Sequence, residues 1–292
     1  MNNSAFAYTI TPLDAAETMA FNMDSFGCIS WFEYGKMVAS PGSTAPVSPD
    51  LQPYIRFFKS RRELFRDAAV VADVAVWRSF ASEVFADPQH AKLTAAVEQR
   101  LIEDRIPFQI VYDQQLSDLK GYRVLVLAGC VALSDDHIRQ IQDFVRAGGR
   151  LCIIGPVATH DQWMNPRTVN PLAGLPSDNA IYAAPSDDWM SAIGKACGSA
   201  MSVSVQGPPG LCMEITAQKN RRLVHLVNYD SSQPAKEITV RLQLPSNKKV
   251  RSVVLASPER SADIKLPFTK QGDALLFTVP AVKVYEIAVI HF

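Results

Sequence analysis

Residues 122–156 read YRVLVLAGCVALSDDHIRQIQDFVRAGGRLCIIGP and contain an apolar strand, an amphipathic helix and a second apolar strand. The apolar runs at 124–128 and 151–154 lack polar alternation, which is typical of parallel strands covered on both faces. Ser134 is placed to cap the intervening helix, and a Gly-Gly pair is placed to end it. A helix joining two such strands predicts a right-handed crossover and a parallel sheet.

The same pattern extends upstream. Two more apolar runs, 70–77 and 108–112, flank a helix whose start is marked by Asp87-Pro88. The sequence therefore predicts an α/β domain with four parallel strands. Functional groups of such sheets gather at the carboxyl ends of the strands. Here the last strand runs into Gly155-Pro156, so we expect no nucleophile at that turn.

We expect three domains. Residues 1–68 read helix, strand, Pro/Ser/Gly-rich loop and helix, a partial α/β segment whose apolar face needs a partner. We expect it to pack on a second copy or on the α/β domain, or to be disordered. Residues 69–199 form the α/β domain. Residues 200–292 contain short strands separated by Pro/Gly/Asn turns, which predicts an antiparallel β-sandwich.

The composition argues against several classes of partner. Lysine plus arginine and aspartate plus glutamate each total 29 in 292 residues, so no basic surplus favours a nucleic-acid backbone. The longest apolar run, 124–133, is about half of a membrane-spanning helix, and the N-terminus lacks the cationic start of a secretory signal. Five scattered cysteines predict reduced thiols. We expect a cytoplasmic protein without nucleic-acid, membrane, metal or cofactor binding.

The thiols are weak candidates for a nucleophile. Cys152 lies inside a predicted strand and reads as core, because free cysteine is among the most buried residues. Cys130 follows the third strand beside Gly129, where a small apolar filler is the favoured interpretation because no histidine is near in the sequence.

The histidines do not form an obvious catalytic group. His160-Asp161 has the composition of half a triad, but such a pair in a polar loop is more often solvated. His225 alternates within a predicted strand and is expected to be hydrogen-bonded in the sheet. His90 and His137 lie in first turns of helices and are expected at the surface.

Glu33 is the best candidate acid. It follows a short apolar strand, and Trp31 and Tyr34 beside it offer a face for stacking on a sugar, although packing of these aromatic residues at a domain boundary is favoured. The acidic pairs at 135–136 and 187–188 are explained by helix dipoles. Glycosidic chemistry needs two carboxylates, and a single one cannot serve both roles. We therefore predict no catalytic residue, and Trp31, Glu33 and Tyr34 as a possible sugar-binding group.

The order of these parts resembles the C-terminal two-thirds of family 42-type β-galactosidases and related glycoside hydrolases. The likeness rests on AAETMAF (15–21) with GCISWF (27–32), FFKSRRELF (57–65) with ADVAV (72–76), IPF (106–108) with VYD (111–113) and YRVLVL (122–127), and VHLVNY (224–229). The resemblance implies the end of a (β/α)8 barrel, then a glutamine-amidotransferase-like trimerisation domain of flavodoxin-like type, then a β-sandwich. A generic flavodoxin-like domain is the alternative.

In that family the catalytic carboxylates follow the fourth and seventh barrel strands, and neither strand has a counterpart in this sequence. The amidotransferase cysteine after the strand at 151–154 is missing too, as it is in the trimerisation domains. The resemblance implies a non-catalytic C-terminal region that serves homo-oligomerisation, as a trimer or dimer, and structural support. One alternative is a glycoside hydrolase acting on galactosides whose barrel lies outside this chain. Another is a carbohydrate-binding module.

Overall fold

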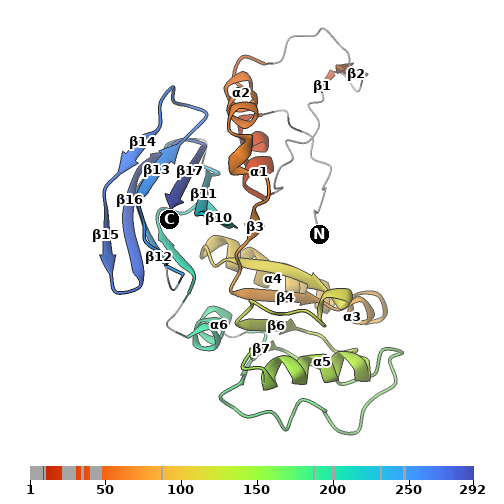
Figure 1. Cartoon of the computed structure of the whole chain (residues 1–292). Coiled ribbons are helices and arrows are strands. Elements are labelled where there is room, and N and C mark those ends of the chain that lie inside the picture. The colour runs from red at the N-terminus through yellow and green to blue at the C-terminus, as the bar shows by residue number, and fades with distance from the viewer. Residues whose placement is uncertain are drawn as a thin grey trace. The chain divides into compact units, whose positions relative to one another are not determined.

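The computed structural model describes residues 9, 11–21, 48–86, 88–186, 188–198, 201–230, 232–245 and 248–292, and the backbone of 31–33 and 36–39. The chain forms two compact units (Figure 1). Ala72–Ser202 make an α/β unit. Met1–Val71 and Val203–Phe292 together make a second unit, referred to as the sandwich unit.

The α/β unit is built on a five-stranded parallel sheet with strand order β5-β4-β6-β7-β8. Its strands are β4 (Val74–Arg78), β5 (Phe108–Tyr112), β6 (Val124–Ala128), β7 (Arg150–Ile154) and β8 (Ala180–Ala183). Numbered along the chain within this sheet, the order is 2-1-3-4-5, which is the flavodoxin-like arrangement. The predicted fold class is confirmed. Strand β8 was not predicted, because its four residues lie within a loop-rich segment.

Helices cover both faces of this sheet. They are α3 (Phe80–Phe85), α4 (Gln89–Glu103), α5 (Asp135–Arg146) and α6 (Trp189–Cys197). Alternate strand residues point to opposite faces: Leu125 packs in the core with α5, whereas Val126 and Cys152 pack in the core with α4 and α6. The Ser134 side chain accepts a hydrogen bond from the His137 amide at 3.1 Å, which confirms the predicted cap of α5.

The predicted strand at 70–77 is divided in the structure. Its first part is β3 (Ala69–Val70), which pairs with a strand of the sandwich unit, and the second part is β4 of the parallel sheet. Asp73 lies at the division. Its buried carboxylate accepts hydrogen bonds from the amide and hydroxyl of Ser202 at 2.8 and 2.7 Å. A buried carboxylate held in this way interrupts the strand.

The sandwich unit contains two antiparallel sheets, with orders β14-β13-β17-β11-β10-β3 and β15-β16-β12-β9. Their strands are β9 (Val203–Gln206), β10 (Leu211–Gln218), β11 (Arg221–Asn228), β12 (Ala235–Gln243), β13 (Ser252–Ala256), β14 (Ile264–Leu266), β15 (Phe268–Gln271), β16 (Ala274–Val282) and β17 (Tyr285–His291). Apolar residues from both sheets form the core between them. The predicted β-sandwich is therefore confirmed.

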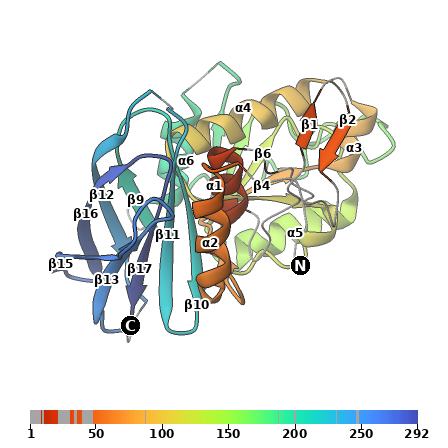
Figure 2. The same cartoon turned by 90° about the horizontal axis from the view of Figure 1, so that it is seen from above.

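Two helices from the start of the chain pack on the other face of the larger sheet (Figure 2). Helix α1 (Pro12–Phe21) and helix α2 (Gln52–Ser60) join the core cluster of β11 and β17, and a short 3-10 helix (Arg62–Leu64) follows α2. We expected this segment to pack on a second copy or on the α/β domain, or to be disordered. For its described helices α1 and α2, the partner is instead the larger sheet of the sandwich unit, whose strands β11 and β17 are buried on both faces.

Candidate functional site at the carboxyl edge of the parallel sheet

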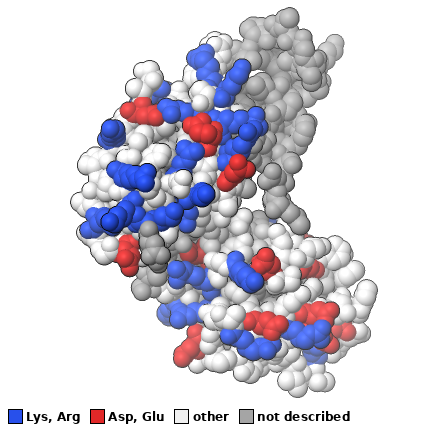
Figure 3. All heavy atoms as spheres, viewed as in Figure 1, with Lys and Arg blue, Asp and Glu red and all other residues white. Residues whose placement is uncertain are grey.

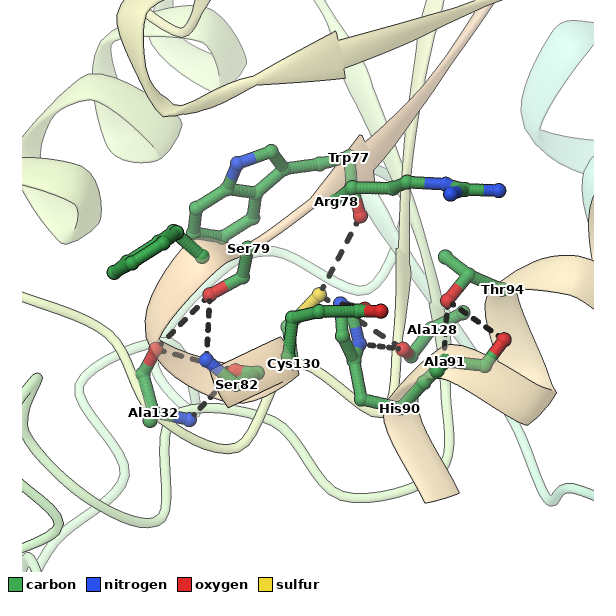
Figure 4. Close-up of polar contacts among 12 residues, drawn as sticks. Trp77, Arg78, Ser79, Ser82, His90, Ala91, Thr94, Ala128, Cys130 and Ala132 are labelled. Carbon is green, nitrogen blue, oxygen red and sulfur yellow. Dashed lines mark hydrogen bonds and ion pairs between the residues drawn. The ribbon is translucent and has the colours of Figure 1, made fainter. Parts of the chain in front are cut away.

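The crevice of this fold lies where the strand order reverses. Strands β5 and β6 lie on opposite sides of β4, so the chain leaves the carboxyl ends of β4 and β6 in different directions, and ligands of flavodoxin-like sheets bind in the crevice between them. Ser79 follows β4 and Cys130 follows β6 closely, which places both at this edge (Figure 4).

Two buried serines, Ser79 and Ser82, lie at this edge. Ser79 caps α3 by accepting a hydrogen bond from the Ser82 amide at 3.3 Å, and its hydroxyl donates to the Ala132 carbonyl at 3.2 Å. The Ser82 hydroxyl donates to the same carbonyl at 3.2 Å and accepts from the Ala132 amide at 3.0 Å. Both hydroxyls are thereby occupied in joining the start of α3 to the loop after β6, and neither has a base as its partner in these bonds.

Cys130 is an unactivated thiol. It is fully buried, and its sulfur donates only long hydrogen bonds, 3.9 Å each, to the carbonyls of Trp77 and Ala128 (Figure 4). Burial raises the pKa of the Cys130 thiol far above its ordinary value, and the charge of Asp113 adds to the rise. A protonated thiol is a poor nucleophile. The structure thus agrees with the interpretation of Cys130 as a small apolar filler.

His90 is buried, so its expected surface position was wrong. The side chain is 1% exposed, with Nδ1 2.8 Å from the Ala128 carbonyl oxygen, and Nε2 lies 3.7 Å from a carboxylate oxygen of Glu83. Nε2 has no hydrogen-bond partner within the described part of the chain. The spacing of His90, Thr94 and Val97 places the histidine on the buried face of α4, and this spacing was the signal that the sequence offered.

His137 is also less exposed than expected. Its ring packs edge-on against Trp77 with centroids 5.3 Å apart, and Nε2 lies 3.9 Å from Oδ2 of Asp113. The other oxygen of Asp113 accepts from the Trp77 indole at 3.0 Å and from the Phe80 amide at 3.3 Å. This carboxylate therefore ties β4 and α3 to the end of β5, and its role is structural.

The turn after β7 has the sharp strand-to-loop geometry in which some enzymes hold a nucleophile, but the residue at this turn is a glycine and has no side chain. Gly155 has φ of +75°, in the left-handed region that favours glycine. A Cβ at this position would lie 3.2 Å from Cγ of Pro185. The sequence places no nucleophile at this turn, and the backbone conformation and the nearby Pro185 also disfavour any side chain at position 155.

The sugar-binding group predicted from the sequence, Trp31, Glu33 and Tyr34, stays a prediction, because the side chains of these residues lie outside the described part of the chain. The backbone of Trp31 and Glu33 lies in β1 (Trp31–Glu33), which pairs with β2 (Lys36–Ala39), and Tyr34 lies outside the described residues. Asp161 is occupied in its own loop, where it accepts from the amides of Trp163 and Asn165 at 2.8 and 2.9 Å.

His225 is buried and hydrogen-bonded in the sheet, as predicted. Its Nδ1 lies 2.8 Å from the Tyr285 hydroxyl, and its Nε2 lies 3.2 Å from the Thr216 hydroxyl. No group of three or more His, Cys, Asp or Glu residues in the described ranges is arranged to hold a metal ion. Among the same residues, no helix has the length and apolar character needed to cross a membrane.

Several solved structures with a similar fold are glycoside hydrolases. No family model and no curated protein matches the chain. The α-L-fucosidase isoenzyme 2 from Paenibacillus thiaminolyticus is 18% identical with a TM-score of 0.63, and the match covers 82% of this chain and 51% of that one. The β-galactosidase from Bacillus circulans sp. alkalophilus is 12% identical with a TM-score of 0.57, covering 81% and 44%. An exo-carrageenase GH42 from Bacteroides ovatus is 13% identical with a TM-score of 0.52, covering 83% and 32%.

The chain shares its fold with part of each of these enzymes. It spans about half or less of the length of each enzyme. The resemblance to glycoside hydrolases, drawn from the sequence, is confirmed for the fold. Residue roles do not follow from identities this low.

Proposed function

We propose that the chain is a non-catalytic C-terminal region of a glycoside-hydrolase-like, β-galactosidase-like protein, and that it serves homo-oligomerisation and structural support. The observation that carries the proposal is the state of the carboxyl edge of the parallel sheet. Gly155 occupies the turn after β7, and the Cys130 thiol is buried and protonated. The α/β domain has a complete parallel sheet with helices on both faces, but no activated nucleophile at its carboxyl edge. Such a domain is suited to contacts between subunits.

An exposed apolar patch on α3 supports this assignment. Phe80, Val84 and Phe85 are 62%, 52% and 50% exposed, and the two phenylalanine rings lie 6.4 Å apart. Tyr112, at the end of β5, is also 50% exposed. Large apolar side chains gathered on a surface mark sites of association, and aromatic residues are enriched at the centres of interfaces. We infer that a second copy of the chain covers this patch.

Light scattering coupled to size-exclusion chromatography tests the proposal. The wild-type chain should elute at micromolar concentration with a mass at least twice its 32.1 kDa. The Phe80→Asp and Phe85→Asp variants should shift to the monomer, because a buried unpaired carboxylate opposes association. Ile264→Asp is the matched control, since Ile264 is exposed on β14, in the sandwich unit. A wild-type chain that is strictly monomeric contradicts the oligomerisation role.

The second candidate is a glycoside hydrolase acting on galactosides whose catalytic barrel lies outside this chain. The comparisons favour it, because the similar enzymes are much longer than the matched part. Both candidates predict that the purified chain alone releases no nitrophenol from a nitrophenyl β-galactoside. Hydrolysis by the chain alone would overturn the non-catalytic assignment. Hydrolysis only after addition of an upstream barrel segment would support the second candidate.

A further inference from the structure

A pocket of about 470 Å³ lies in the sandwich unit, between α2 and the loop that follows β13. Its charged lining comes from Arg56 and Arg61 on the helix side and from Glu259, Arg260 and Asp263 in the loop. None of these residues belongs to the carboxyl edge of the parallel sheet or to the apolar patch on α3. The pocket is therefore a separate feature of the molecule.

Two of the arginines that line this pocket form ion pairs with carboxylates. Arg61 pairs with Asp263 at 2.7 Å, and Arg260 forms a two-pronged ion pair with Glu286, whose longer contact is 2.8 Å. The lining contains three guanidinium groups and two carboxylates, and Glu286 on β17, outside the lining, supplies a third carboxylate as the partner of Arg260. Lysine and arginine are common on the exposed face of this unit (Figure 3). The pocket differs from that surface, because it presents charged donors and charged acceptors together.

Two buried polar atoms beside the pocket lack partners. The Tyr54 side chain is 2% exposed, and its hydroxyl lies close to the Glu259 carboxylate of the lining without a hydrogen bond of good geometry to any described residue. Burial raises the pKa of Tyr54 well above its ordinary range, and Glu259 raises it further, so the hydroxyl remains a donor next to the lining. The Arg260 side chain is 27% exposed, but its Nε atom is buried and has no hydrogen-bond partner within the described ranges. Buried polar atoms left without partners are rare and call for an explanation such as a bound molecule.

We propose that this pocket binds a neutral polyhydroxyl ligand, namely a sugar residue. A sugar hydroxyl both donates and accepts, so it can donate to a carboxylate while it accepts from the neighbouring guanidinium. Ser261 adds a further hydroxyl to the lining, whereas the Ser257 hydroxyl already donates to the Tyr285 carbonyl and accepts from the Glu259 amide. Phe57 and Pro53 offer an apolar surface for the C–H face of the ring. The site goes beyond the proposed assembly role and needs no catalytic group.

Ligand-observed NMR on the full chain tests the inference, with D-galactose, L-fucose and D-glucose and their short oligosaccharides as probes. At least one neutral sugar should bind saturably. Ser261→Trp, which fills the mouth of the pocket, and Arg61→Ala, which removes a charged donor, should each weaken it about tenfold or more, the equivalent of one charge-assisted hydrogen bond. Thr269→Trp, on exposed β15 of the other sheet, is the matched control and should leave the affinity unchanged.

Three outcomes would overturn the inference. The first is the absence of saturable binding for every neutral probe. The second is binding that both pocket variants leave unchanged, including binding that only Trp31→Ala removes. The third is binding of glucuronate or inorganic phosphate alone with strong salt dependence, which would identify an anion site. Chromatographic mass is measured on the same variants, so that a failure of sugar binding is distinguished from a failure of assembly, and thermal melting confirms that each variant is folded.

Discussion

Glu214 on β10 and His225 on β11 occupy directly opposite positions in the larger sheet of the sandwich unit. Both strands are contacted by α1, and His225 lies among Phe65 and Tyr285 on the face that α1 and α2 cover. Burial raises the pKa of Glu214 to about 8 and lowers the pKa of His225 to about 3. At neutral pH, Glu214 is therefore largely protonated and His225 is uncharged, and their titrations affect stability in opposite directions.

Stability should decline above about pH 4.5 through Glu214. Because its pKa is raised on folding to about 8, its contribution is complete at low pH and is lost as the pH rises between about 4.5 and 8. The Glu214 carboxylate accepts a hydrogen bond from the Ile215 amide at 2.9 Å. In Glu214→Gln the side-chain oxygen can still accept this bond, but the side chain can no longer ionise. We expect the free energy of unfolding of the variant to exceed that of the wild type by about 1 kcal/mol or more at pH 8.5, and the two values to be nearly equal at pH 5. Urea denaturation at both values checks this, and a difference that does not change with pH would contradict it.

His225 should produce the opposite slope. Its pKa is lowered on folding, so its contribution is complete above about pH 6.5 and is lost as the pH falls towards 3. In the Glu214→Gln background, where the opposing titration is absent, the free energy of unfolding should fall by up to about 1.4 kcal/mol per pH unit below 6. His225→Gln in the same background should flatten this slope while lowering stability at pH 7. Equal slopes in the two proteins would show that another group is responsible.

Gly155 should tolerate no side chain. Gly155→Ala places a Cβ at φ of +75° and 3.2 Å from Cγ of Pro185. We expect a loss of about 1–2 kcal/mol in the free energy of unfolding, measured by urea denaturation. Gly174→Ala is the matched control, because a Cβ there meets nothing within 4 Å, and its effect should stay within about 0.5 kcal/mol. A Gly155→Ala protein as stable as the control would remove the argument that this turn excludes a side chain.

The buried thiols should be unreactive in the native protein. Burial raises the pKa of Cys152 to about 12 and that of Cys130 beyond this, whereas Cys212 is partly exposed. Iodoacetamide at pH 8, followed by peptide mass spectrometry, should label Cys212 and leave Cys130 and Cys152 unmodified. All three should react in guanidinium chloride. Native labelling of Cys130 as fast as that of Cys212 would mean that the thiol is accessible, and would reopen a chemical role for it.

Much of the secondary structure of the α/β unit could be predicted from the sequence. The apolar runs that became β6 and β7 and the capping serine at 134 are local signals, and each predicted its element because strand period and cap chemistry are set by near neighbours. The missing nucleophile at Gly155 was equally readable, since it depends on one position after a strand. His90 was misplaced because helix position alone was considered, without its alignment with Thr94 and Val97.

By itself, the sequence determined most of the strands and helices of the α/β unit, with β8 as an exception, the sandwich and α/β fold class, and the lack of a nucleophile in the turn after β7. The tertiary structure decided which face covers α1 and α2, the division of the 70–77 run at Asp73, and the burial of His90 and Cys130 at one edge. It also brought Arg61 beside Asp263, about 200 residues later in the chain, to line the proposed sugar pocket. Local patterns state how much apolar surface a segment must bury, whereas the partner that buries it is selected by contacts between residues far apart in the sequence.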